Sequence, residues 1–541
     1  MHVSRRRMFG AAVFGLILLS AGPTVPDAHA QYFGRNKVRY SSFDFEILRT
    51  EHFDIYFNKD EAQAVEYAGR MMERWYSRLS RLLDHELTRR QPLILYSAHP
   101  QFEQTNAVSG ELSEATGGVT EIFKRRIVLP FAGPLAETDH VLGHELVHAF
   151  QFSITGQGRN DAALLVPSAV RLPLWFIEGM AEYLTLGPID PHTAMWMRES
   201  VRDRDLPFVS DLWNPRYFPY RYGQSLWAYI AGRWGDQAVG QLLKVAGQTI
   251  DVEVAIQHVL EITSDSLSFA WHNALRSQYD AVAAVTDTVA EFATEIIGPD
   301  ITGGNLNIAP SISPDGDYLV YLSERGLFSI DMYMANARTG EIERRLTSTA
   351  SDPHFESLQF INSAGAWSSD SRFFAFGGIT RGKPVISIIE AATGDREKDL
   401  RVDEVDEIFN PTWSPDGRSI AFSAIQAGLM DLWVIDVADG ELRRLTNDAF
   451  AEMMPDWSPD GSSIAFVTDR FGADFETLKM GTYRLAVIDP DTKVQEVVPG
   501  FSEGKDINPQ WSSDGSSLFF ISDRGGISNL FRVDMSTGTG C

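Results

Sequence analysis

A recurring Trp-Ser-Pro-Asp-Gly segment restricts what the C-terminal half of this chain can fold into more than any other feature. Five complete or partial copies follow one another, with turn aspartates spaced 55, 46, 44 and 54 residues apart: Asp315, Asp370, Asp416, Asp460 and Asp514. Proline presets the φ of a turn's second position and glycine closes it, so each copy predicts a tight turn. Several short strand-like runs, including an Asp-Gly hairpin at 439–440, fill each period. Four antiparallel strands per period predict β-propeller blades, with the tryptophans packed between neighbouring blades.

The repeats resemble the TolB-like, WD40-like β-propeller family over about residues 301–541. The resemblance implies a ring that typically closes with six blades and a module that acts through protein contacts, here with an envelope protein. The chain ends at residue 541, before the fourth strand of its fifth blade. An incomplete blade leaves open strand edges, so either residues 31–300 help to close the ring or the sequence is a fragment of a longer protein. We favour the fragment.

The first half of the chain has a different pattern. Three short runs alternate or cluster apolar residues as strands do: 53–57, 92–96 and 126–130. Apolar residues recur at helical spacing between Val65 and Leu82, and helical periodicity dominates from residue 139 to about 284. The patterns predict a multidomain protein in which an α+β domain over 31–295 precedes an all-β propeller over 296–541.

The pattern H-E-x-x-H, formed by His144, Glu145 and His148, lies in the helical region. Residues i and i+4 of a helix project from one face, so both imidazoles can bind one cation. Glu145 then lies beside the metal, where it can act as the general base on a metal-activated water. A catalytic zinc needs a third protein ligand and an open position. Glu178 is the expected third ligand, and Glu182, one turn further on, is expected to fix the tautomer of a ligating histidine.

These motifs, with W-x-x-E-G-x-A beginning at Trp175, resemble those of the gluzincin metallopeptidases and, more narrowly, the peptidase MA-like secreted proteins. The resemblance covers about residues 33–60 and 115–230. It implies a zincin-like fold with one Zn²⁺ per chain held by the two motif histidines and Glu178, and Glu145 as the catalytic base. Taken alone, both downstream glutamates fit better on the surface of an ordinary helix, but beside Trp175 and Phe176, and thirty residues after His148, we favour ligation. The gap before the third ligand is longer than in aminopeptidase-type members, so specificity for an N-terminal amine is not implied.

Two further assignments concern side chains near the motif. A tetrahedral intermediate needs a hydrogen-bond donor besides the metal, and Tyr217, Tyr220 and Tyr222 lie in a suitable Tyr- and Pro-rich segment. We favour Tyr222; packing ahead of the next helix is the alternative for each. His140 lies one turn before His144, but three successive turns of a straight helix diverge from a single ion, so we expect His140 to be structural.

Two local patterns bear on substrate binding and on the type of reaction. The strand at 126–130, preceded by Gly117 and Gly118, is expected to offer its edge to an extended peptide by strand addition. A G-x-S-x-G match around Ser502 is not expected to be a nucleophile elbow, because residues 505–509 lead into the next blade and not into a helix.

The first 30 residues have the three parts of a secretory signal peptide. A basic run at 5–7 precedes an apolar stretch from residue 8 to about 21, and an A-x-A site follows at 28–30. The alternative is an uncleaved N-terminal anchor, which the prolines and the aspartate between 23 and 27 disfavour. We therefore expect a periplasmic or extracellular protein with no membrane span after cleavage, exported by the general or, given the paired arginines, the twin-arginine route.

Charge and cysteine content exclude several classes of function. The chain has 47 Lys+Arg against 73 Asp+Glu, a net charge of −26, which argues against nucleic acid or an anionic membrane as a partner. Cys541 is the single cysteine, so an intrachain disulfide and a thiolate zinc cluster are excluded. Any metal must be bound by His, Asp and Glu.

Two hypotheses of function follow. The first is a secreted zinc-dependent endopeptidase that hydrolyses a peptide or protein substrate, with the propeller binding that substrate or a partner protein. The second is an envelope binding or assembly protein in which the propeller acts and the metal domain is vestigial. Because all four metal-site residues are present at workable spacing, we favour the enzyme.

Overall fold

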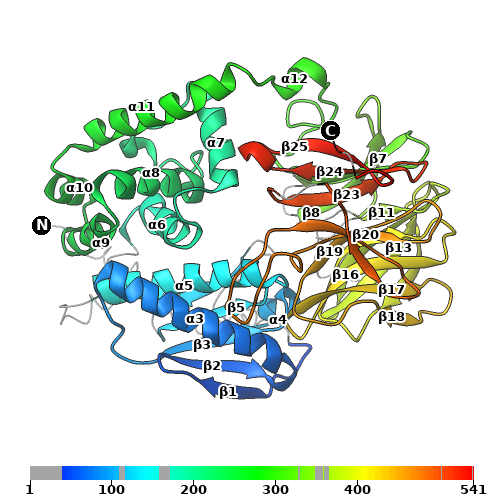
Figure 1. Cartoon of the computed structure of the whole chain (residues 1–541), viewed down its shortest axis with the longest axis horizontal. Coiled ribbons are helices and arrows are strands. Elements are labelled where there is room, and N and C mark those ends of the chain that lie inside the picture. Colours follow the sequence, from blue (N-terminus) through cyan, green and yellow to red (C-terminus); the bar gives the residue numbers. More distant parts are fainter. Residues whose placement is uncertain are drawn as a thin grey trace, which may run out of the picture.

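The computed structural model describes residues 39–108, 112, 116–122, 124–156, 171–326, 329–347, 357–358, 365–500, 503–538 and 540. The expected signal peptide, Ser502 and Cys541 lie outside the described residues. The described chain forms an α-rich domain with one sheet and, beside it, a β-propeller (Figure 1).

A five-stranded sheet in the order β1-β2-β3-β5-β4 forms the base of the α-rich domain. Its strands are β1 (Phe45–Arg49), β2 (Phe53–Asn58), β3 (Gln91–Tyr96), β4 (Val119–Glu121) and β5 (Arg126–Pro130). The three strands expected from the sequence are β2, β3 and β5, which pair in parallel; β1 and β4 are antiparallel edge strands. The expectation that β5 offers its edge was wrong, because β3 and β4 pair with both of its edges. The outer position on that side of the sheet belongs to β4.

Helices cover the sheet and build the upper part of the domain. They are α3 (Ala62–Leu83), α4 (His99–Glu103), α5 (Leu135–Thr155), α6 (Leu174–Leu186), α7 (Pro191–Arg202), α8 (Pro219–Trp234), α9 (Gln237–Thr249), α10 (Val252–Leu260), α11 (Ser264–Ala283) and α12 (Val289–Phe292). Among the described residues, no helix combines the length and apolar content needed to cross a bilayer. The boundary expected near residue 295 lies between α12 and the first propeller strand.

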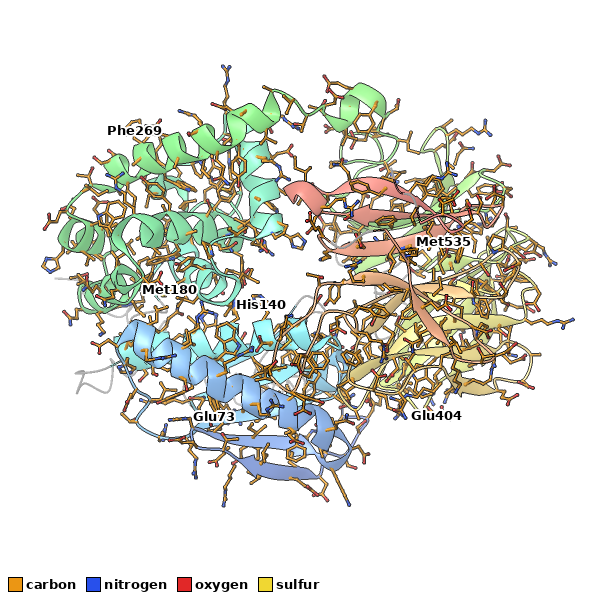
Figure 2. The ribbon with its side chains drawn as sticks, in the orientation of Figure 1. Glu73, His140, Met180, Phe269, Glu404 and Met535 are labelled. Atoms are coloured by element: carbon orange, nitrogen blue, oxygen red, sulfur yellow. The ribbon has the colours of Figure 1, made fainter. Side chains whose placement is uncertain are left out.

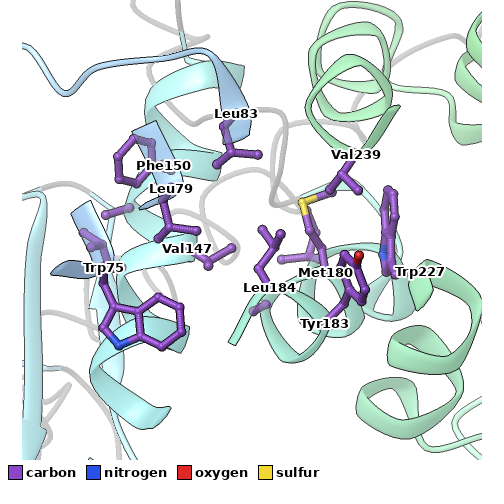
Figure 3. Packing of buried hydrophobic residues seen from close by; sticks show 14 of the residues in the cluster. Trp75, Leu79, Leu83, Val147, Phe150, Met180, Tyr183, Leu184, Trp227 and Val239 are labelled. Atoms are coloured by element: carbon purple, nitrogen blue, oxygen red, sulfur yellow. The ribbon is translucent and has the colours of Figure 1, made fainter. Parts of the chain in front are cut away.

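The core of this domain lies between α3, α5, α6, α8 and α9. Trp75 of α3, Phe150 of α5 and Trp227 of α8 are among its buried residues (Figure 3). The helices α6 and α8 cross with backbone contact, since a Cβ on Gly179 would lie 2.3 Å from the Cα of Gly223. Only glycine fits at such a crossing, and the crossing brings the helix that carries Glu178 against the start of α8.

Within the described residues, five small antiparallel sheets form the propeller. The first blade has β6 (Asn307–Ile312), β7 (Tyr318–Gly326), β8 (Ser329–Asn336) and β9 (Ile342–Arg345), and the second has β10 (Ser357–Leu358), β11 (Ala366–Trp367), β12 (Phe373–Thr380), β13 (Lys383–Glu390) and β14 (Arg396–Arg401). The third blade has β15 (Glu407–Trp413), β16 (Ser419–Gln426), β17 (Leu429–Asp436) and β18 (Leu442–Arg444). The fourth has β19 (Glu452–Trp457), β20 (Ile464–Thr468), β21 (Arg484–Ile488) and β22 (Gln495–Val497). The fifth has β23 (Asp506–Trp511), β24 (Ser517–Ser522) and β25 (Asn529–Asp534). The expected five blades, with three strands in the last, are confirmed.

The repeated turn is built as its sequence predicts. In the third blade the Ser414 hydroxyl donates to Asp416 Oδ1 at 2.7 Å and accepts from the Ser419 amide at 3.0 Å. Gly417 has a φ of 71°, which disfavours any residue with a Cβ. The indole of Trp413 donates to the carbonyl of Ala366 in the preceding blade at 3.2 Å. The expected packing of the repeat tryptophan between blades is therefore confirmed at this position.

The long connection between β20 and β21 of the fourth blade packs against the α-rich domain. Arg70 of α3 donates to the carbonyl of Phe475 at 3.2 Å, and Arg74 donates to that of Leu478 at 2.7 Å. The side chains of Phe475 and Leu478 also belong to the core cluster of the α-rich domain. Apolar burial and charge-assisted hydrogen bonds together hold the two domains against each other.

Candidate metal centre

Helix α5 carries the H-E-x-x-H motif through the middle of the domain. His144 and His148 are 9% and 8% exposed, so both imidazoles are removed from bulk water. The helix can approach its neighbours because residue 143 is glycine: a Cβ there would lie 2.7 Å from the Trp75 ring. Figure 2 shows His140, one turn earlier on the same helix, on the side of the domain that faces the propeller.

Helix α6 brings Glu178 to the two motif histidines. Glu178 Oε2 lies 3.2 Å from His144 Nε2 and 3.3 Å from His148 Nε2, and the two Nε2 atoms are 3.2 Å apart. Ligands at about 2.0–2.1 Å from a tetrahedral zinc ion are separated by about 3.3 Å, so this triangle has the spacing of three such ligands. The three residues predicted as ligands from the sequence therefore lie together, and their donor set of two imidazoles and a carboxylate suits zinc.

The outer nitrogen of each histidine has its own partner. His144 Nδ1 lies 3.0 Å from Glu182 Oε1, the contact expected from the sequence. His148 Nδ1 lies 2.8 Å from Gln151 Oε1, and the amide of Gln151 donates to the carbonyl of Ile177 at 2.9 Å. Partners of this kind fix the tautomer that leaves Nε2 available to a metal.

Glu182 itself contacts a further histidine and an arginine. His140 Nε2 lies 3.3 Å from Glu182 Oε1, and Arg221 Nη1 lies 3.3 Å from Oε2. The same Arg221 nitrogen is 3.2 Å from Asp190 at the start of α7. His140 is not a member of the His144, His148 and Glu178 group, but it forms a second group with His144 and Glu182 whose spacing could also hold a metal ion. That His140 is structural stays a prediction.

Glu145 lies beside the triangle of His144, His148 and Glu178, next to strand β4. The hydroxyl of Thr120 donates to Glu145 Oε2 at 2.6 Å and also lies 2.8 Å from the Glu145 carbonyl. The residue just before the strand passes so close that a Cβ on Gly118 would lie 2.9 Å from Glu145 Cγ. These contacts fix the carboxylate of Glu145 against the edge strand.

The charges of the cluster compensate one another. Burial by itself raises the pKa of Glu178, but hydrogen bonds from His144 and His148 and their charges hold it well below its ordinary value. Burial by itself lowers the pKa of His144, but hydrogen bonds with Glu178 and Glu182 raise it, and a metal ion that bound at Nε2 would displace the proton from that nitrogen. The carboxylates therefore stay ionised and can serve as ligand and hydrogen-bond acceptor.

The tyrosine nearest the triangle is Tyr220, not Tyr222. The Tyr220 ring stacks on His144 with centroids 5.9 Å apart, and the Glu178 carboxylate lies close enough to Tyr220 to act on the pKa of its hydroxyl. Burial and the Glu178 charge raise the pKa of Tyr220, which keeps the phenol protonated. The Tyr222 hydroxyl instead lies 2.6 Å from Ser200 Oγ on α7, with its ring against Tyr217. The structure therefore brings Tyr220 to the cluster and directs Tyr222 toward α7.

Sequence reasoning missed Thr120, Gln151 and Arg221. A signal was available only for Gln151, which lies three residues after His148 and so on the same side of the helix. Thr120 and Arg221 reach the site from a strand and a helix that no local pattern connects with the motif. Their roles follow from tertiary packing alone.

Comparison with known proteins concerns the propeller. Residues 355–476 match the family model of the TolB beta propeller domain. The chain is similar to TolB from Agrobacterium tumefaciens, with 23% identity over 44% of this chain and 79% of that one and a TM-score of 0.36. It is also similar to TolB from Acinetobacter baumannii, with 19% identity over 52% and 70% of the two chains and a TM-score of 0.35. No curated protein matches the chain. The expected TolB-like propeller is confirmed for the matched residues, and the metal cluster lies outside them.

Proposed function

We propose that this protein is an exported zinc-dependent endopeptidase whose α-rich domain has a zincin-like fold of the gluzincin type. The triangle of His144 Nε2, His148 Nε2 and Glu178 Oε2, with sides of 3.2, 3.2 and 3.3 Å, carries the proposal. These residues would hold one Zn²⁺, and the partners of the histidines' outer nitrogens support that role. Bound zinc supplies Lewis acidity, which polarises a peptide carbonyl and makes water a nucleophile at neutral pH.

Glu145 is the general base in this proposal. It takes the proton of the attacking water and delivers it to the leaving amine. Because the Thr120 hydroxyl occupies Oε2 at 2.6 Å, we assign proton transfer to Oε1. Thr120 is a positioning residue that keeps the carboxylate oriented while the proton moves.

Tyr220 replaces Tyr222 as the donor to the developing oxyanion. A donor must lie next to the reacting carbonyl, and the contacts of Tyr220 with His144 and Glu178 support such a position. Its raised pKa favours the protonated form that donates a hydrogen bond. Tyr222 keeps a packing role beneath α7.

The propeller acts as the binding module for the substrate or for an envelope partner protein. The match of residues 355–476 to the TolB propeller model supports a binding function, and it also favours the second candidate, a binding or assembly factor with an inactive metal domain. The two candidates differ in whether loss of the metal ligands abolishes the activity of the protein.

The test is metal content per chain, measured on the purified chain as wild type and as Glu178→Ala, with casein hydrolysis on the same samples. Glu66→Ala, an exposed glutamate on α3, is the matched control. We expect about one zinc and hydrolysis in wild type and control, and loss of both in Glu178→Ala. Wild-type chain that binds no zinc would overturn the proposal and favour the binding factor; bound zinc without hydrolysis of casein or of a random peptide library would leave a metal site with no peptidase.

A further inference from the structure

A row of aromatic rings leads away from the proposed metal site. The Tyr220 ring lies nearly parallel to His144, at an interplanar angle of 16°. Phe218 stacks on Tyr220 with centroids 5.1 Å apart, and Trp196 lies 5.7 Å from Phe218 at 33°. The rings come from the end of the Tyr-rich segment and from α7, so two chain segments build one surface. We call Tyr220, Phe218 and Trp196 the aromatic shelf.

The shelf passes from buried to exposed. His144 is 9% exposed and Tyr220 is half-buried, whereas Phe218 is 41% and Trp196 38% exposed. Two large aromatic side chains thus hold part of their surface in water at the outer end of the row of rings that begins at His144. When an apolar group of a ligand covers such exposed apolar surface, both are removed from water, which makes binding more favourable.

The outer rings are held in place from below. Trp196 meets the edge of Tyr222 at 6.3 Å, and Tyr222 is fixed by its hydrogen bond with Ser200. Arg221 joins the start of α7 to α8 through its 3.2 Å contact with Asp190. A surface that is already ordered loses little conformational entropy when a ligand binds, so its burial counts almost fully toward affinity.

We propose that the aromatic shelf is a substrate subsite that accepts an aromatic side chain of a peptide held at the metal centre. The inference rests on the proposed function, because the shelf begins on the ring of a proposed ligand. Flat rings at stacking distance favour a flat apolar partner, and aromatic pairs gain more than the burial of area alone. The subsite therefore selects peptides with phenylalanine, tyrosine or tryptophan close to the bond at the metal.

The test uses the full chain carrying Glu145→Gln, which keeps the metal ligands and the shelf but lacks the proposed base. Binding is measured by fluorescence anisotropy for two labelled peptides that differ only in one central residue, phenylalanine or alanine. We expect the phenylalanine peptide to bind roughly tenfold more tightly, since burial of part of one aromatic ring is worth about that factor. The preference should be lost when Phe218→Ala or Trp196→Ala is added.

Trp213→Ala is the matched control, because Trp213 is 65% exposed and is not part of the shelf. Circular dichroism and the thermal midpoint show whether each variant is folded, and Phe218→Leu replaces Phe218→Ala if the latter is not. A preference that survives in both shelf variants, or that Trp213→Ala removes equally, overturns the subsite, as does the absence of any preference in the parent chain.

The outcomes separate this inference from the proposed function. Wild-type chain that hydrolyses peptides without regard to aromatic residues overturns the shelf and leaves the peptidase standing. Wild-type chain that hydrolyses no peptide, although the Glu145→Gln chain prefers phenylalanine through Phe218 and Trp196, overturns the peptidase and leaves the shelf as a peptide-binding site.

Discussion

The buried Glu182 of the candidate metal cluster lies beside imidazoles, whereas the buried Glu452 of the propeller lies beside an arginine and other carboxylates. In the metal cluster, burial opposes ionisation of Glu182, yet hydrogen bonds with His140 and His144 lower its pKa to about 2. In the fourth blade, burial raises the pKa of Glu452 to about 8, and the charge of Asp448 adds to the rise. The same functional group is thus ionised at Glu182 and protonated at neutral pH at Glu452.

This difference shows that a buried acid is not by itself the mark of a site. Asp431 of the third blade is fully buried, but its partners Arg444 at 2.5 Å and Thr446 at 3.0 Å come from its own blade and brace that blade. In the α-rich domain the partners come from different helices and converge on one point with their Nε2 and Oε2 atoms. Convergence of donors, and not burial, distinguishes the candidate metal centre.

The largest effect is expected from Glu145→Gln in the candidate metal centre. We expect peptide hydrolysis to fall about a thousandfold, because the amide cannot take a proton from water, while zinc content stays at the wild-type level. The measurement is the rate of peptide hydrolysis together with metal content. Glu66→Gln on the outside of α3 is the control, and a rate near wild type in Glu145→Gln would exclude this residue as the base.

Glu452→Gln tests the propeller side of the comparison. The raised folded pKa of about 8, against an ordinary value of 4.5, means that the folded chain binds the proton more tightly than the unfolded chain. Stability from this group is present at low pH and is lost as pH rises from about 5 to 8. The free energy of unfolding of wild type should fall, relative to the variant, by on the order of 3 kcal/mol over that range.

Urea unfolding at several pH values measures this effect, and comparison with the variant cancels the pH dependence of the metal site. Glu441→Gln, an exposed glutamate of the third blade, is the control and should show no such trend. A difference between wild type and Glu452→Gln that does not change with pH would mean that Glu452 is ionised in the folded blade.

Glu182→Gln tests how much the carboxylate that contacts His144 Nδ1 contributes to zinc affinity. The amide can still accept from His144 but has lost its charge, so we expect zinc affinity to fall by roughly ten- to a hundredfold. Competition with a chelator measures the affinity. Glu199→Gln, exposed on α7, should bind zinc as wild type does; equal affinity in both variants would assign Glu182 to packing alone.

The smallest effect is expected from Ser414→Ala in the repeated turn. The change removes the hydrogen bonds of 2.7 Å to Asp416 and 3.0 Å from Ser419, which should lower the free energy of unfolding by about 1 kcal/mol. Zinc content should stay unchanged, as should peptide hydrolysis. Ser77→Ala on the exposed face of α3 controls for loss of a hydroxyl, and a reduced zinc content in Ser414→Ala would show that the domains are more strongly coupled than their contacts imply.

Local chemistry made much of this molecule predictable. The propeller could be predicted because the residues of its repeated turns restrict the backbone conformation. The strands β2, β3 and β5 could be predicted from short runs of alternating or clustered apolar residues. The ligand triangle was predictable because His144 and His148 share a helix face and Glu178 sits on the next helix. Strand order was not: β4 is three residues long, too short for a period of two to be recognised, and its place outside β5 overturned the expected free edge.

The sequence by itself determined the repeat, the propeller blades and the residues that meet at the metal triangle, because turn geometry and helical spacing act over a few residues. Only the tertiary structure decided that Tyr220 and not Tyr222 faces His144, that Thr120 holds Glu145, and that Phe218 and Trp196 continue the ring row outward. Those choices depend on how α6 and α8 cross at Gly179 and Gly223 and on where β4 passes over α5. Packing between distant segments sets these positions, and such packing leaves no periodic signal along the chain.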